Sequence, residues 1–289
     1  MIKHVSKIIL AVIVLCGFTF PNVAYSTTIV KSKWEMALYE QVNLWIDTLI
    51  KNDERFDGFK SNTFTTRTLG PNMKQWLLTF KNNEGLTTGY LVVGGQDDKQ
   101  PYEWVLLEYG LGEYALFNED DEQVDIHISD YTPIYHNPFE LYWLSNKKSV
   151  VHYRHHLSYE EVPVDEDAIS KQADLLQSNQ QQLNRNIAET VRINERDLVD
   201  PFDYVFWLVK PPLKADEIIT KLQSIKDVQQ PPSFVFESTS YNGLVQEAFT
   251  VTGYHKWNND FYISIEEQDI IRFIPSTVAE QYGNFFVSN

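Results

Sequence analysis

The chain has 289 residues, one cysteine and a formal net charge of −16 at pH 7, from 40 acidic and 24 basic side chains. This acidity disfavours nucleic acid and anionic membrane surfaces as partners, and it favours cations or basic partners. Aromatic residues make up 14% of the chain, which indicates a packed globular protein rather than a disordered one.

The N-terminal segment 1–26 has the pattern of a secretory signal peptide. Lys3 and Lys7 precede an apolar run over 8–20, and small side chains stand before an expected cleavage point after Ser26. The run would form about 20 Å of helix, less than the ~30 Å hydrocarbon core of a bilayer. We therefore expect cleavage and secretion, with no stable membrane insertion afterwards. An uncleaved signal that anchors the protein to the membrane is the alternative.

Cys16 lies inside this leader, so the mature chain is predicted to contain no cysteine. Because Lys3 and Lys7 leave with the leader and no acid does, the mature charge becomes −18. Lipidation of Cys16 is disfavoured because Leu15, rather than a small residue, precedes it.

The next part, 27–164, is predicted to be an α+β module. Trp34, Leu38, Val42 and Trp45 recur at helical spacing, which predicts an amphipathic helix over 33–51. Alternating or continuous apolar runs separated by turn residues then predict an antiparallel meander packed on this helix. The expected strands are 75–80, 90–93, 102–109, 139–144 and 149–153.

Residues 165–199 are predicted to form a long connecting helix or linker. Ile169, Leu176 and Leu183 are seven residues apart, and the other positions are rich in Gln and Asn. The last part, 200–289, is predicted to be a second domain in which helices flank a set of strands. Its expected elements are a helix carrying Ile218 and Leu222, strands 234–236, 245–253, 261–265 and 270–274, a helix over 275–283 and a strand over 285–287.

No cofactor is predicted, because the sequence lacks the motifs of zinc peptidases, serine hydrolases and nucleotide-binding loops. His152, His155 and His156 form the densest group of imidazoles and are weak candidates for a metal site. In a strand His155 would point away from the other two, so hydrogen-bonded or solvated side chains are the preferred interpretation.

Two carboxylate patterns admit an enzymatic or metal interpretation. The acidic run over 118–122 could bind calcium, but no glycine provides the sharp turn of a calcium loop, which favours a solvated loop. Glu103, Glu108 and Glu113 could supply the two acids of a glycosidase, but sequence spacing does not show that they face one cleft.

The segment Glu247-Ala248-Phe249-Thr250-Val251-Thr252-Gly253-Tyr254 is followed by a turn and by Tyr262-Ile263-Ser264-Ile265-Glu266. A short helix and a strand over 275–287 close the chain. In this order the last third resembles the C-terminal half of secreted papain-like cysteine peptidases of the double-glycine-leader-processing type, which implies a papain-like half-barrel.

The resemblance also implies that the peptidase chemistry is lost. Glu247 stands where this family has its catalytic histidine, and the mature chain has no cysteine to serve as nucleophile. The orienting residue of the family falls near Ser264 or Glu266. We therefore expect no catalytic residue, with Glu247, Ser264 and Glu266 as positions of a degenerate site. Glu247 is expected to be an ordinary acid that is partly solvated or paired with Lys or Arg.

The first module has a second resemblance. Its helix, followed by 89–93 and 107–109, is similar to the pro-domains and PepSY-like inhibitory modules of secreted bacterial peptidases. Together the two resemblances imply a secreted, non-catalytic binding protein, a pseudo-peptidase that binds a peptide or a secreted peptidase. A secreted hydrolase that uses carboxylates or a serine nucleophile is one alternative, and a cell-surface structural or adhesion protein is another.

Overall fold

The computed structural model describes residues 32–61, 63–70, 74–95, 103–114, 116–117, 130–147, 150–164, 187–193, 198–203, 205–225 and 232–288. The predicted signal peptide (1–26), the acidic run over 118–122 and the greater part of the predicted connecting helix (165–186) lie outside the described residues. Residues 33–289 belong to one compact unit.

The predicted amphipathic helix is confirmed as α1 (Lys33–Asn52), and a 3-10 helix η1 (Glu54–Ser61) follows it. Leu38, Val42 and Trp45 of α1 are at most 1% exposed. They pack with Phe56 and Phe59 of η1 against one face of the sheet described next, in an aromatic-rich core. Burial of this apolar stripe explains why the segment is helical, because most helix stability comes from such packing.

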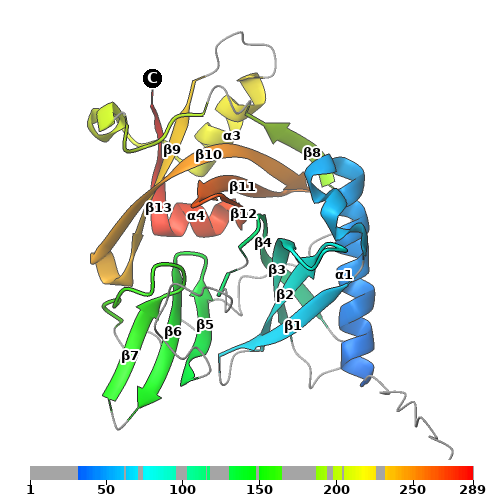
Figure 1. The fold of residues 1–289 in the computed structure, drawn as a ribbon. Coiled ribbons are helices and arrows are strands. Elements are labelled where there is room, and N and C mark those ends of the chain that lie inside the picture. Colours follow the sequence, from blue (N-terminus) through cyan, green and yellow to red (C-terminus); the bar gives the residue numbers. More distant parts are fainter. Residues whose placement is uncertain are drawn as a thin grey trace, which may run out of the picture. The chain divides into compact units, whose positions relative to one another are not determined.

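A ten-stranded sheet dominates the structure (Figure 1). Its order is β1-β2-β3-β4-β12-β11-β10-β9-β13, all pairs are antiparallel, and β8 also pairs with β10. The strands are β1 (Phe64–Leu69), β2 (Gln75–Lys81), β3 (Thr87–Gly95), β4 (Trp104–Leu111), β8 (Ile187–Arg192), β9 (Phe234–Ser240), β10 (Val245–Trp257), β11 (Asp260–Glu267), β12 (Ile270–Pro275) and β13 (Gly283–Val287).

A separate three-stranded sheet contains β5 (Thr132–Asn137), β6 (Glu140–Lys147) and β7 (Val150–His155), drawn in green in Figure 1. The remaining helices are η4 (Val205–Val209), α3 (Ala215–Ser224), η6 (Tyr241–Gly243) and α4 (Ser276–Tyr282). The helices α3 and α4 pack their apolar sides against β9–β11 and β13, with Ile218, Leu222 and Ala279 buried.

The predicted α+β class is confirmed, but the two expected modules share one sheet. Strand β12 of the last third pairs with β4 of the first part, with Arg272 opposite Gly110. The expected boundary near residue 165 therefore does not separate two sheets. Residues 187–192 were expected at the end of the connecting helix, and this expectation is wrong because they form β8 and pair with β10. Among the described residues no helix is both long and apolar enough to cross a membrane.

Candidate functional site

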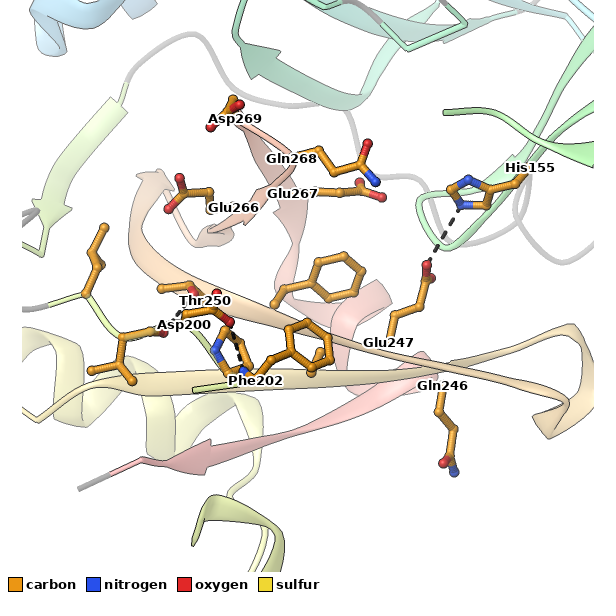
Figure 2. A pocket seen from close by; sticks show the side chains of 15 residues that line it. His155, Asp200, Phe202, Gln246, Glu247, Thr250, Glu266, Glu267, Gln268 and Asp269 are labelled. Carbon is orange, nitrogen blue, oxygen red and sulfur yellow. Dashed lines mark hydrogen bonds and ion pairs between the residues drawn. The ribbon is translucent and has the colours of Figure 1, made fainter. Parts of the chain in front are cut away.

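A cleft of about 500 Å³ opens where the β11–β12 turn, the start of β10, the end of β7 and the segment 198–202 meet (Figure 2). Among the residues that the structure describes, five carboxylates line it and no Lys or Arg does. The lining residues are His155, Leu198, Val199, Asp200, Pro201, Phe202, Gln246, Glu247, Ala248, Phe249, Thr250, Glu266, Glu267, Gln268 and Asp269.

A tight hairpin presents three of these side chains. Gln268 and Asp269 connect β11 to β12, and both have positive φ, at 45° and 67°. Two consecutive residues with positive φ give the type I′ geometry that matches the twist of paired strands. The hairpin thereby places Glu266, Glu267 and Asp269 along one side of the cleft.

Glu247 enters the cleft from β10, and its carboxylate faces His155 at the end of β7. Glu247 Oε1 lies 3.8 Å from His155 Nε2, and the Glu247 side chain is 31% exposed. Burial and the nearby charge of Glu267 raise the pKa of Glu247 to about 7, although Arg272 opposes the shift. Glu247 is partly solvated, as expected, but its raised pKa is not that of an ordinary acid, and the ionisable side chain that it faces is His155 rather than Lys or Arg.

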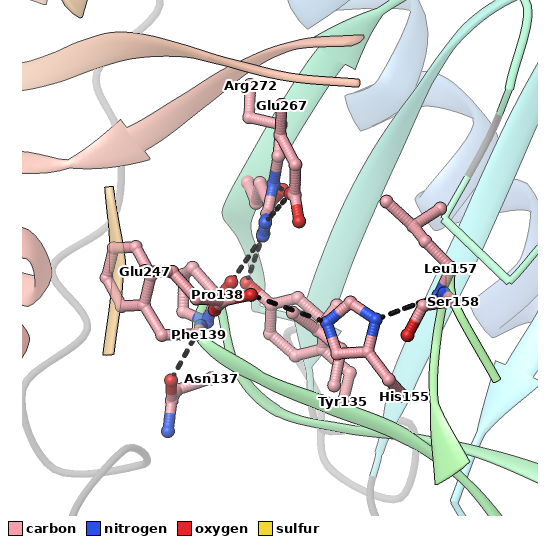
Figure 3. A network of polar contacts seen from close by, with 12 residues as sticks. Tyr135, Asn137, Pro138, Phe139, His155, Leu157, Ser158, Glu247, Glu267 and Arg272 are labelled. Carbon is pink, nitrogen blue, oxygen red and sulfur yellow. Dashed lines mark hydrogen bonds and ion pairs between the residues drawn. The ribbon is translucent and has the colours of Figure 1, made fainter. Parts of the chain in front are cut away.

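Behind the cleft lies a buried ionic network centred on Arg272 (Figure 3). Arg272 donates from Nε and Nη2 to the two carboxylate oxygens of Glu108, at 2.7 and 3.1 Å, and from Nη1 to Glu267 Oε2 at 2.5 Å. Nη2 also donates to the carbonyl of Pro138. Burial alone would lower the pKa of Arg272, but the charges of Glu108 and Glu267 outweigh this and raise it well above its usual value.

Two tyrosines complete the hydrogen bonding of Glu108. Tyr90 donates to Oε1 at 2.6 Å and Tyr135 donates to Oε2 at 2.9 Å. Both tyrosine pKa values are raised by burial and by the Glu108 charge, so the hydroxyls remain donors. Glu103 and Glu113 lie before and after β4 and are exposed, so the structure does not bring the three acids of the glycosidase hypothesis together.

The three candidate histidines are not arranged as the sequence predicted. His152 lies 3.5 Å from Glu161. The rings of His155 and His156 lie together, with centroids 4.4 Å apart. The expectation that His155 points away from His156 is wrong, because β7 ends at His155 and His156 begins a turn, so strand alternation stops there.

His155 and His156 have different surroundings. Nδ1 of His155 accepts contacts from the backbone N–H groups of Ser158 and Leu157, at 3.2 and 3.4 Å. His156 is 2% exposed, and neither of its ring nitrogens has a hydrogen-bond partner of normal geometry, although the Leu141 carbonyl is nearby. Burial lowers the pKa of both imidazoles, well below its usual value for His156.

The other degenerate-site positions lie apart. Glu266 lines the cleft, whereas Ser264 is 1% exposed and its hydroxyl accepts a hydrogen bond from Thr252 at 2.8 Å. Ser264 is therefore neither accessible nor beside an imidazole, and it does not qualify as a nucleophile.

Sequence reasoning missed a second buried polar cluster. His255 Nε2 lies 3.0 Å from Asp53 Oδ2, and His255 Nδ1 lies 2.9 Å from the Tyr109 hydroxyl. Because Trp257 donates to that hydroxyl, the Tyr109 proton points to Nδ1 and the His255 proton faces Asp53. Arg55 also binds Asp53, at 2.6 Å. The arrangement resembles a catalytic relay, but His255 is fully buried and has no room for a substrate.

No protein-family model matches the chain, and no curated protein or solved structure is significantly similar to it. The resemblances to papain-like peptidases and to PepSY-like modules therefore remain hypotheses, and the geometry of the site carries the functional argument.

Proposed function

We propose that this protein is a secreted, non-catalytic binding protein whose cleft holds a basic peptide segment. The observation that carries the proposal is the lining of the cleft, whose described part contains Asp200, Glu247, Glu266, Glu267 and Asp269 and no Lys or Arg. A concave surface of one sign raises the local concentration of oppositely charged ligands and steers their approach. The overall acidity of the chain acts in the same direction.

Exposed apolar side chains at and just after the cleft-lining segment 198–202 favour a basic segment that also carries apolar side chains. Phe202 lines the cleft and is 72% exposed. Val205, Leu208 and Val209 of η4 follow within seven residues and are also exposed. Trp207 holds η4 to the protein by packing against Phe286. Exposed apolar clusters of this kind mark interaction sites in soluble proteins.

The degenerate peptidase interpretation forms part of this proposal. The last third has the expected succession of a helix, strands, a short helix and a closing strand. Neither Glu247 nor Ser264 offers an activated nucleophile in the cleft. Such a module would keep a peptide-binding surface and lack cleavage chemistry. Its ligand would be a free peptide or a basic segment of a secreted peptidase.

Secretion is a separate part of this proposal, and it has a direct test. We expect the mature protein to begin at Thr27. Sequencing the N-terminus of the exported product checks this. A start at Cys16, or an intact Met1 in the membrane fraction, would contradict cleavage after Ser26 and favour an anchor.

Binding can be tested with fluorescent peptides that combine Arg or Lys with apolar residues. Anisotropy at low salt should show binding that weakens with added salt, and the same peptide with Glu in place of its basic residues should not bind. Replacing Glu266→Gln and Asp269→Asn together should weaken binding at least about tenfold, equivalent to about 1.4 kcal/mol. Leu208→Ser with Val209→Ser should weaken it separately.

The matched control is Glu113→Gln, because Glu113 is an exposed acid that does not line the cleft. It should bind like the unmodified protein. The proposal fails if no basic peptide binds at low salt, or if Glu113→Gln and the cleft variants weaken binding equally, since the charge of the whole surface would then be responsible.

One observation favours a second candidate, a hydrolase that uses carboxylates. A carboxyl with a pKa near 7 beside other carboxylates is the usual form of a general acid. In that case Glu247 would donate a proton, and Glu266 or Glu267 would act on water. Turnover of casein or a peptide library that disappears in Glu247→Gln would move this candidate ahead of the binding protein.

A further inference from the structure

The wall between the cleft and the buried network carries a second feature, which the peptide proposal uses only through the charge of Glu267. One ligand-type atom from each of His155, His156 and Glu267 lies within 4.8 Å of the other two. Two imidazoles and one carboxylate make up a common ligand set for zinc. The atoms come from the β7 turn and the end of β11, which are far apart in the sequence.

His156 supplies the independent observation that a ligand belongs here. Its ring is almost fully buried, yet both nitrogens lack a hydrogen-bond partner of normal geometry. An unpaired buried polar group costs about 1–3 kcal/mol, so native proteins rarely keep one without an unseen water or ion.

The charges around the cluster also favour a cation. Arg272 is neutralised by the bidentate contact with Glu108. Glu267 also accepts a hydrogen bond from Arg272. Two carboxylates therefore face one guanidinium, and the network keeps one net negative charge. Glu247 adds a further carboxylate that faces His155 at 3.8 Å. A divalent cation would balance this excess of acid.

We propose that His155, His156 and Glu267 bind a Zn²⁺ ion, with Glu247 or water in the fourth position. In a tetrahedral site with bonds of about 2.0–2.1 Å the ligand atoms lie roughly 3.3 Å apart. The ligand atoms of the three residues lie within 4.8 Å of one another, so a closure of at most about 1.5 Å brings them to this spacing. The site does not depend on the peptide-binding proposal, because it can be measured without peptide.

Binding at His155 has an identifiable cost. Nδ1 accepts two long backbone contacts, so the proton of the neutral ring is on Nε2, the atom that faces Glu247. Coordination through Nε2 moves that proton to Nδ1 and gives up the contacts with Leu157 and Ser158. We therefore expect a modest affinity, on the order of 10⁻⁶ M, rather than that of a structural zinc site.

The test uses the purified protein, stripped with a chelator and titrated with Zn²⁺ against a chromophoric chelator and with Co²⁺ by absorption. We expect one equivalent to bind and tetrahedral Co²⁺ bands to appear. His156→Gln and His155→Gln should each weaken Zn²⁺ binding at least about tenfold. His155→Gln keeps the test valid if His156→Gln misfolds, because the His155 side chain is 16% exposed. Circular dichroism checks that both variants are folded.

The matched control is His152→Gln, which changes the third histidine of the segment 152–156, outside the cluster. It should bind Zn²⁺ like the unmodified protein. The proposal is overturned if the protein does not compete for Zn²⁺ at micromolar concentration, if folded His156→Gln and His155→Gln bind as well as the unmodified protein, or if His152→Gln loses binding equally. Peptide binding measured in chelator reports separately on the proposed function.

Discussion

Arg272 on β12 holds both carboxylate oxygens of Glu108 on β4, and the pair is buried on all sides. In the β4–β12 register Arg272 lies opposite Gly110, which places Glu108 diagonally on the same face. Tyr90 of β3 also lies opposite Gly110 and reaches Glu108 across it. A Cβ at Gly110 would come within 2.5 Å of the Tyr90 ring, so glycine is needed at this point.

This pair joins the two segments that share the sheet, and its removal should be costly. Arg272→Met leaves Glu108 buried without its cation, and loss of one partner of a buried pair costs about 3–5 kcal/mol. Urea unfolding of the variant should show a decrease of that size in the free energy of unfolding, with an unchanged denaturant slope.

The double variant Arg272→Met with Glu108→Gln should lose less than the two single variants added together, because Glu108 no longer leaves a buried charge without its cation and only Glu267 keeps its charge. Lys60→Met is the surface control. Lys60 pairs with Asp57, but both side chains are more than half exposed, so the change should be under about 1 kcal/mol. A cost below 1 kcal/mol for Arg272→Met would contradict the buried network.

The Asp53–His255 pair should make stability depend on pH at the acid end. Burial alone would raise the pKa of Asp53, but hydrogen bonds from His255 and Arg55 outweigh it and lower the pKa below 3.8. The stabilisation by Asp53 is therefore fully present above its unfolded pKa of about 3.9 and is lost as the pH falls toward the folded value.

Asp53→Asn should consequently lower the free energy of unfolding by about 2–4 kcal/mol near neutral pH, and the difference from the unmodified protein should narrow below about pH 4. Thermal unfolding across this range measures it. Asp57→Asn, in an exposed pair, serves as the control. A difference that is constant with pH would show that Asp53 is not ionised in the folded protein.

Much of the secondary structure could be predicted because its signals are local. The 3.6-residue period of α1 and the apolar runs of β2–β4 and β9–β12 identify each element by itself. Residues 187–192 were misassigned for a physical reason. Ile187 continues the four-residue spacing from Leu183, while Glu189 interrupts the alternation that would have indicated a strand.

The candidate site could hardly be predicted from local patterns, because strand pairing between distant segments brings its residues together. Glu108 and Arg272 are 164 residues apart, and Asp53 and His255 are 202 apart. No spacing in the sequence links such partners, and strand register decides whether they meet. Glu247 was identified as a position of interest, but its raised pKa depends on Glu267 and on burial, which only the fold determines.

Limited proteolysis can test the organisation of the chain. The sequence of 165–200 is polar and Gln-rich, and such segments are preferred sites of cleavage. We expect a first cut in this region and two main fragments. Because β4 pairs with β12, the fragments should stay associated in size-exclusion chromatography until denaturant is added. Fragments that separate under native conditions would instead support two independent domains.

The last prediction concerns Glu247, whose pKa is shifted upwards, in the opposite direction to the pKa of Asp53. Its pKa rises from 4.5 in the unfolded chain to about 7 in the folded protein. Between these values the folded state holds a proton that the unfolded state has released, so the contribution of Glu247 to stability falls as the pH rises through this window. Above the window Glu247 is charged in both states and its burial is a constant penalty.

Glu247→Gln has no proton to release, so in chelator-containing buffer it should match the unmodified protein near pH 4.5 and become more stable above pH 7. The gain should be about 1–2 kcal/mol, because partial exposure of the side chain screens the penalty. Urea unfolding at several pH values measures the difference, and Glu113→Gln should show less than about 0.5 kcal/mol at every pH. If the Glu247→Gln curve runs parallel to that of the unmodified protein across the window, Glu247 is a normal acid, and burial and the charge of Glu267 do not raise its pKa.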